Sequence, residues 1–434
     1  MRLQAVALAL LLLPCLASAH GKYPSVTAVV AHPSDANTLA LRTNFGVVVS
    51  RDGGKTWRWI CEEAANTVAD SQPSLAFAGT GQLAAASSNG LAMSDAALCE
   101  WTPVAQPAYA GTRRVAAVVR DPSNAQRLLA LARDDATQWR LIASTDAGKA
   151  WAPLGKPLPA GIFVQSLAIA TTGRVYVTAR AGLNAFDQLF LHTDSAGQVW
   201  QALPFAPTQT DESGVALPAN QTLVVAAYVA EIDASDANRL YLRVERAQTD
   251  QIWQTSDGGQ TWLKRFEGQG RLPGVALSPD GSQLAVADAF TPGGVWLAPS
   301  AGGPFVRTGS TAVRCLTWTA SGLYGCGAEE VDGFSVGVSH DKGAHFVGLY
   351  RRKETQPLKC PTQTTTGGVC PAAWFPTGTT LGIVTDPTLV AVPPPPAATS
   401  GCVARPVAHH MAEVVLAALG GLIWTGRSRR RATP

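Results

Sequence analysis

The chain has 434 residues, 46% of them hydrophobic, which is ample for a large core, and its formal net charge is +3. Four arginines near the C-terminal end carry this excess: Arg427, Arg429, Arg430 and Arg431. The rest of the sequence is close to neutral, which argues against nucleic acid as a partner.

The N-terminal segment, residues 1–19, is predicted to be a secretory signal peptide. It contains a basic Arg2, an apolar run from Leu3 to Leu13, and the small residues Ala17-Ser18-Ala19 before an expected cleavage at His20. We therefore expect export, and disulfide bonds become permissible in the mature protein.

An eight-residue phrase that closes on an aromatic recurs along the chain. Its clearest copies are Ser50–Trp57, Ser144–Trp151 and Thr255–Trp262, and a looser copy is Ser339–Phe346. Three weaker copies are His192–Trp200, interpreted as carrying one extra residue around Asp194 and Gly197, then Ser94–Trp101 and Ala298–Phe305. A phrase that recurs at such a period is typical of stacked or radially arranged units.

Short strand-like runs precede each copy of the phrase. Before the first copy they are Val26–His32, Thr38–Arg42 and Gly46–Ser50, divided by Pro, Asn, Asp and Gly. The closing aromatics recur roughly every 40 to 60 residues, a spacing that suits four short strands. The sequence thus predicts an all-β fold over residues 20–353, a seven-bladed β-propeller of four-stranded antiparallel blades.

The phrase also has a chemical logic. An Asp in a tight turn accepts backbone hydrogen bonds, Gly supplies a positive φ, and the aromatic buries apolar area. These residues resemble Asp-box (BNR-repeat) β-propellers, a group with sialidases, xyloglucanases, sortilin-type receptors and photosystem assembly factors, over residues 25–353. The resemblance implies structural roles for Asp52, Trp57, Asp146, Trp151, Asp194, Trp200, Asp257, Trp262, Asp341 and Phe346.

Six cysteines lie between the signal peptide and the tail. Nearest-neighbour pairing predicts the disulfides Cys61–Cys99, Cys315–Cys326 and Cys360–Cys370. Zinc is disfavoured because no CxxC pair is present, and no metal or other cofactor is expected. Residues 354–386 are predicted to form a disulfide-containing extension packed on the propeller.

The C-terminal part changes composition. Residues 387–401 are predicted to be a Pro-rich linker, and residues 402–434 combine Cys402, an apolar run from Val414 to Gly426, and the arginine cluster. This order resembles the C-terminal sorting tails of myxobacterial surface proteins, which implies anchoring at the cell surface or outer membrane. A plain, marginally long membrane helix is the alternative.

Ligands of a propeller bind where the loops between second and third strands meet the connections between blades. The candidates on that face are Phe45, Arg133, Asp134, Phe186, Asp187, Glu245, Arg246, Phe290, Glu329 and Asp332. Interleaved aromatic and charged residues favour recognition of a protein or a glycan.

Two functions follow as hypotheses. The first is a surface-tethered, monomeric module, without catalysis, that binds or assembles an envelope protein or glycan. The alternative is an exo-acting, sialidase-like glycoside hydrolase, which in that family uses an arginine triad and a Tyr/Glu pair. The Arg-Ile-Pro motif of sialidases does not precede the first phrase, where the sequence is Leu39–Asn44.

Overall fold

The fold is that of a computed structural model, which describes residues 23–68, 72–79, 81–104, 114–133, 138–182, 188–204, 224–290 and 293–383. The chain divides into two compact units, Met1–Val390 and Ala391–Pro434. The predicted signal peptide, linker and tail lie outside the described residues.

Seven sheets, each with four consecutive antiparallel strands, make up the blades of the first unit. Blades 1 to 3 comprise β1 (Val26–Ala31), β2 (Leu39–Thr43), β3 (Val47–Ser50) and β4 (Trp57–Ile60); β5 (Ser74–Ala78), β6 (Gln82–Ser87), β7 (Gly90–Ser94) and β8 (Trp101–Pro103); and β9 (Val115–Asp121), β10 (Asn124–Arg133), β11 (Trp139–Ser144) and β12 (Ala152–Leu154). Blade 4 comprises β13 (Ile162–Ile169), β14 (Val175–Ala181), β15 (Gln188–Thr193) and β16 (Gln201–Leu203).

The remaining blades follow the same order. They comprise β17 (Val224–Ile232), β18 (Leu240–Arg246), β19 (Asp250–Thr255) and β20 (Leu263–Glu267); β21 (Gly274–Leu277), β22 (Gln283–Asp288), β23 (Gly294–Pro299) and β24 (Val306–Gly309); and β25 (Leu316–Thr319), β26 (Gly322–Cys326), β27 (Val336–Ser339) and β28 (Val347–Tyr350). The predicted seven-bladed β-propeller of four-stranded antiparallel blades is confirmed.

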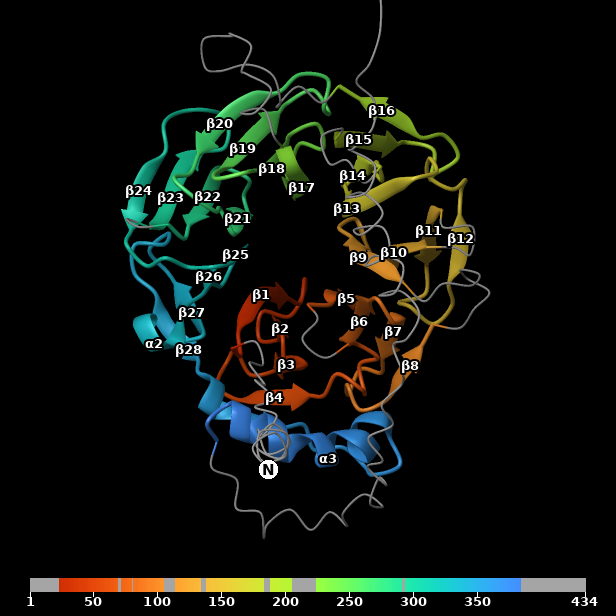
Figure 1. Cartoon of the computed structure of the whole chain (residues 1–434), viewed down its shortest axis with the longest axis vertical. Coiled ribbons are helices and arrows are strands. Elements are labelled where there is room, and N and C mark those ends of the chain that lie inside the picture. Colours follow the sequence, from red (N-terminus) through yellow and green to blue (C-terminus); the bar gives the residue numbers. More distant parts are fainter. Residues whose placement is uncertain are drawn as a thin grey trace, which may run out of the picture. The chain divides into compact units, whose positions relative to one another are not determined.

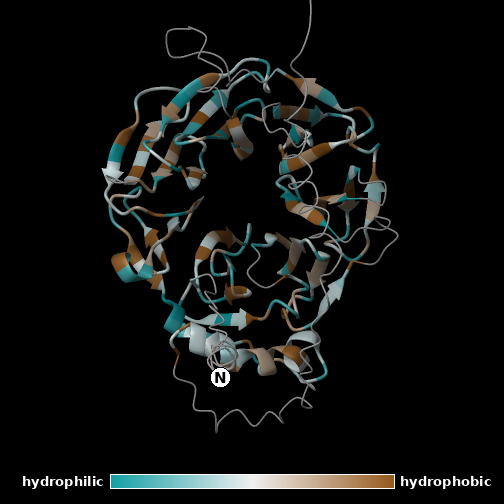
Figure 2. Cartoon of the chain, in the orientation of Figure 1, coloured by the Kyte–Doolittle hydropathy of each residue, from teal (hydrophilic) through white to brown (hydrophobic). Residues whose placement is uncertain are grey.

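The blades follow one another around a ring, with the first strand of each blade innermost (Figure 1). Middle strands such as β3 are buried along their whole length, because neighbouring blades cover both faces of each sheet. Apolar residues accordingly appear on the strands all around the ring (Figure 2). Outer strands such as β20 carry no fully buried residue.

Hydroxyl groups join the inner strands of neighbouring blades. Ser74 of β5 exchanges hydrogen bonds with both backbone groups of Val118 on β9, and Thr317 of β25 donates to the carbonyl of Val29 on β1 at 2.6 Å. The last contact links blade 7 to blade 1. Backbone groups at the free edges of the inner strands are satisfied in this way.

The octapeptide turns, which join the third and fourth strands, repeat one hydrogen-bond pattern. In blade 1, Asp52 accepts from Thr56 N at 2.9 Å, and Ser50 accepts from Gly54 N at 2.8 Å. The same bonds recur around Asp146, Asp257 and Asp341. At Gly259, with φ of +102°, a Cβ would lie 2.8 Å from Phe190 of the preceding blade, so only glycine fits.

Blade 4 corrects one prediction. The acceptor in its turn is Ser195, whose hydroxyl accepts a hydrogen bond from Val199 N at 3.0 Å. Gly197 N donates a hydrogen bond to the Thr193 hydroxyl at 3.1 Å. Its copy therefore runs from Thr193 to Trp200 without an extra residue. Asp194 instead forms an ion pair with Arg174 at 2.5 Å, since the position after the strand points its side chain away from the turn backbone.

The closing tryptophans of blades 1, 4 and 5 connect each of these blades to the one before it, whereas the indoles of Trp101 and Trp151 donate within their own turns. The indole N–H of Trp57 donates to Leu349 in blade 7, and that of Trp262 donates to Pro204, which follows blade 4. Trp200 likewise donates to Lys156, which follows blade 3. The aromatic therefore contributes a directional contact between blades in addition to apolar burial.

The C-terminal clasp, residues 352–383, closes the ring from outside. It comprises η1 (Arg352–Glu354), β29 (Thr355–Pro357), which pairs in parallel with β4, and α3 (Thr365–Thr380). Trp374 of α3 packs against Trp59 of β4, with ring centroids 5.4 Å apart. No helix in the described part of the chain, α3 and the short α2 (Glu329–Asp332) included, is long and apolar enough to cross a membrane.

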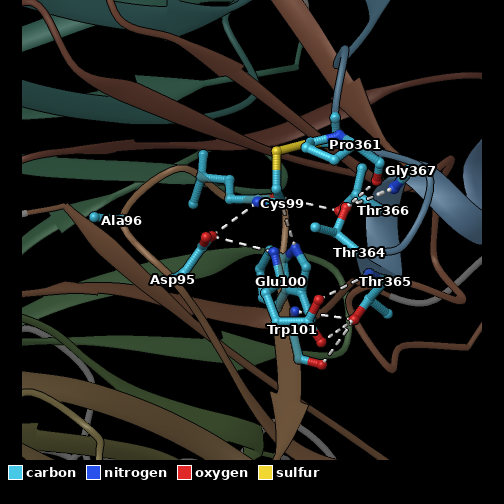
Figure 3. Close-up of a disulfide and its surroundings, with 12 residues drawn as sticks. Asp95, Ala96, Cys99, Glu100, Trp101, Pro361, Thr364, Thr365, Thr366 and Gly367 are labelled. Atoms are coloured by element: carbon cyan, nitrogen blue, oxygen red, sulfur yellow. Dashed lines mark hydrogen bonds between the residues drawn. A yellow bond between two sulfur atoms is a disulfide. The ribbon is translucent and has the colours of Figure 1, made fainter.

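Two disulfides fasten this clasp and correct the predicted pairing. The bonds are Cys61–Cys370 and Cys99–Cys360, in place of Cys61–Cys99 and Cys360–Cys370, whereas the predicted Cys315–Cys326 is confirmed. The physical reason is that β29 and α3 return to the outer edge of blades 1 and 2. Beside Cys99, Thr365 donates to the carboxylate of Glu100 (Figure 3).

Candidate functional site

The strongest candidate site is the inner cluster, defined as Arg42, Arg180, Tyr228, Arg243 and Glu245. Tyr228 lies on β17, the innermost strand of blade 5, and its register partner on β18 is Arg243. Residues paired in this way share a face of the sheet, and so do residues two apart on one strand. The Arg243 guanidinium accordingly lies 4.8 Å from the Tyr228 ring centroid and 2.8 Å from the Glu245 carboxylate.

Charge in the inner cluster is unbalanced. Burial raises the pKa of Tyr228, and the charge of Glu245 raises it further, while Arg243 and Arg180 oppose this rise. Arg42 of blade 1 donates to Thr27 at 3.0 Å, and its pKa is lowered by burial and then by the charge of Arg243. Three guanidinium groups thus act on a region where two carboxylates, Glu245 and Asp250, also act, and this excess of positive charge favours an anionic ligand.

A second group, the rim cluster, lies beside it and consists of Arg246, Asp250, Arg271 and Phe290. Asp250 is 1% exposed and accepts from Arg271 at 2.8 Å, and Arg271 also donates to the carbonyl of Arg246 at 2.9 Å. Arg271 keeps 52% of its side chain exposed and Phe290 55% of its surface. This rim therefore presents a cation and an aromatic ring on a fixed support.

The predicted ligand-face residues have diverse surroundings. Glu245 belongs to the inner cluster, and Arg246 and Phe290 belong to the rim cluster. Phe45 is only 7% exposed and packs in the core of blade 1, and Arg133 lies at the end of β10 with intermediate exposure. Asp134, Phe186 and Asp187 lie outside the described residues.

Glu329 and Asp332 hold the blade 7 corner together. Glu329 accepts from Ser335 at 2.5 Å and from Arg352 N at 2.9 Å, and Asp332 accepts from Ala328 N at 2.7 Å. Both carboxylates are thus engaged by neighbouring protein groups. In the described ranges no group of three His, Cys, Asp or Glu side chains is arranged to hold a metal ion.

Sequence reasoning missed most of the inner cluster. Arg42, Arg180, Tyr228 and Arg243 lie within strands, whereas the sequence predicted ligand contacts on loops. The available signal was the polar residue placed inside an apolar strand, as Tyr228 and Arg243 are within β17 and β18.

No protein-family model matches the chain, and no curated protein matches it. YCF48 from Cyanidioschyzon merolae is 13% identical over 74% of this chain and 94% of its own, with a TM-score of 0.46. Sqt1 from Saccharomyces cerevisiae is 12% identical over 76% of this chain and 86% of its own, with a TM-score of 0.46.

A third solved structure is the Cps50 (Swd1) β-propeller domain of Myceliophteria thermophila. It is 13% identical over 70% of this chain and 96% of its own, with a TM-score of 0.44. The strand pairing described above makes the chain a seven-bladed β-propeller independently of these likenesses.

Proposed function

We propose that this chain is an exported, surface-tethered propeller whose inner cluster binds an anionic group of an envelope protein or glycan without chemically changing it. The observation that supports this is the excess of guanidinium groups around Tyr228, inside the ring and partly withdrawn from water. A cation in such surroundings attracts an anion more strongly than one in bulk solvent does.

The rim cluster supports a ligand that extends beyond its charged group. Phe290 and Arg271 are both exposed next to the inner cluster, and together they suit a sugar ring or an aromatic side chain. In this proposal the octapeptide turns are Asp-box turns with a structural role, away from the ligand.

A sialidase-like hydrolase is the second candidate, and one observation favours it. Tyr228 and Glu245 lie beside the same guanidinium, the arrangement of residue types that the sialidase resemblance requires. The environment of Tyr228 argues against it, because a nucleophilic phenol needs a lowered pKa and burial raises this one. The binding function is therefore preferred.

The test is a binding and turnover screen on the folded protein. Arg243→Gln should weaken retention on acidic glycans or envelope proteins by about tenfold or more, while Arg174→Gln, on the opposite, turn-bearing end of blade 4, should leave it unchanged. Neutral glycans should not be retained. Equal retention by both variants would contradict the proposal, and turnover of a chromogenic sialoside that Glu245→Gln abolishes would establish the hydrolase instead.

Export and tethering rest on the sequence patterns at the two ends. Truncation after Thr399 removes Cys402, the apolar run and the arginine cluster, and should release the propeller into the medium. Fractionation of cells that express the two forms measures this. If the full chain is itself wholly released, the tail does not act as a tether.

A further inference from the structure

A cavity lies at the other end of the inner strands, near the octapeptide turns. It has a volume of about 300 Å³ and is lined by the last residues of β9, β13 and β17, among them Arg120 and Glu231. Tyr228 lies three residues before Glu231 on β17, so the cavity is distinct from the inner cluster. Its size is at the lower limit for small-molecule sites.

Glu231 has no partner for its charge. It makes no hydrogen bond or ion pair to any residue in the described ranges, and burial raises its pKa to about 8. The carboxyl is therefore mostly protonated at neutral pH. Asp233, on the same cavity wall, differs because it accepts from Ser235 at 2.6 Å and pairs with Arg239 at 3.3 Å.

Arg120 is the opposite charge on the far wall. It too makes no hydrogen bond or ion pair with a described residue, and burial lowers its pKa, which the charge of the neighbouring Asp121 partly opposes. The acid and the base are both half-buried, so each has lost part of its water without gaining a protein partner among the described residues. A ligand that carries both complementary charges relieves both costs at once.

We propose that this cavity binds a small zwitterion of amino-acid or dipeptide size, with its ammonium group at Glu231 and its carboxylate at Arg120. The ammonium group favours the ionised carboxylate, so binding at pH 7 releases a proton. Besides Arg120 and Asp233, the titratable group nearest along the sheet is Tyr241, the register partner of Glu231, whose own pKa burial raises to about 12. Tyr241 therefore stays neutral throughout the range of the test.

Calorimetric titration of the full chain with alanyl-alanine tests the proposal. Its N-acetylated and C-amidated forms each remove one charge, and we expect each to bind at least about tenfold more weakly. In Glu231→Gln, alanyl-alanine should bind about as weakly as the acetylated form binds to the unaltered protein. Glutamine has nearly the same shape and is neutral, as the acid is before binding, so folding should be preserved.

Two further measurements make the result decisive. Heats recorded in buffers of different ionisation enthalpy should show proton release that falls as pH rises past 8. Arg120→Gln should remove the effect of amidation, whereas Arg243→Gln in the inner cluster should change nothing. The proposal is overturned if none of the three peptides binds at about 10 mM, if the blocked forms bind equally well, or if only Arg243→Gln abolishes binding.

Discussion

Asp257 organises the turn between β19 and β20 with hydrogen bonds from three residues. Its carboxylate accepts from Thr255, Gln260 and Thr261, with the shortest bond, to the Thr261 hydroxyl, at 2.6 Å. Asp257→Ala should reduce the free energy of unfolding by about 1–3 kcal/mol, because several donors in a packed turn lose one acceptor. Urea unfolding of the two proteins measures the difference.

Asp194 supplies a matched control within the same kind of turn. Its ion pair with Arg174 is exposed, and exposed ion pairs contribute at most about 1 kcal/mol to stability. The acceptor of the turn is Ser195, so the Asp194 side chain is not needed there. Asp194→Ala should therefore be close to neutral. Equal destabilisation by the two variants would refute the assignment of Ser195.

The Asp257 carboxylate also makes the stability of the protein depend on pH. Burial alone would raise the pKa of Asp257, but the hydrogen bonds from Thr255 and Thr261 outweigh it and lower the pKa from 3.8 to about 2. A lowered folded-state pKa gives stability that is present above pH 3.8 and is lost as pH falls through about 2. The stability difference between the protein and Asp257→Asn should shrink over that interval in urea unfolding, and a constant difference would contradict it.

At the scale of elements, the clasp depends on its two long-range disulfides. They join residues 309 and 261 positions apart, whereas Cys315–Cys326 closes a separation of only 11. Loss of Cys61–Cys370 alone, by Cys61→Ser with Cys370→Ser, should cost about 2–4 kcal/mol because Cys99–Cys360 still holds the clasp. Guanidinium unfolding is the measurement.

Loss of both long-range bonds should cost considerably more, and it should also expose β4 by releasing β29. The matched control is the pair Cys315→Ser and Cys326→Ser, whose short loop constrains the unfolded chain least. If this control were the more destabilising change, the clasp would not be what closes the ring.

The sequence was sufficient to predict the blades and an extension packed on them, and insufficient to predict how the cysteines pair. The octapeptide, with its fixed Ser, Asp, Gly and Trp positions, marks a turn that local chemistry specifies, as at Ser144–Trp151. Cysteine pairing depends instead on where a distant segment packs, and nothing near Cys61 indicates that residue 370 returns to it. In blade 4, Asp194 misled because a serine can accept the same hydrogen bond as an aspartate.

For the whole molecule, the disulfide pattern predicts how a cut ring behaves. A site-specific protease sequence inserted after Lys149, in the exposed turn before β12, lies between Cys99 and Cys315. The two fragments should migrate as one species without reductant and separate with it, because both clasp disulfides span the cut. Separation without reductant would instead support the pairs Cys61–Cys99 and Cys360–Cys370, which do not span the cut.

The candidate site was less predictable than the fold for a reason of scale. Loops can be recognised locally, but the inner cluster is assembled from β2, β14, β17 and β18, which belong to three blades. Only the ring brings the charge of Arg243 close enough to Arg42 to affect its pKa. Glu245 was predicted correctly as a ligand-face candidate because its place depends only on the strands and turn of a single blade.

The pairing of the clasp also sets an order on biosynthesis. Cys61 and Cys99 leave the ribosome early, and their native partners are made 309 and 261 residues later. A chain oxidised as it emerges would join these two first, and thiol–disulfide exchange would then have to undo the bond. An incomplete chain therefore cannot form the two native clasp disulfides. These bonds can form only after synthesis has passed the end of the propeller.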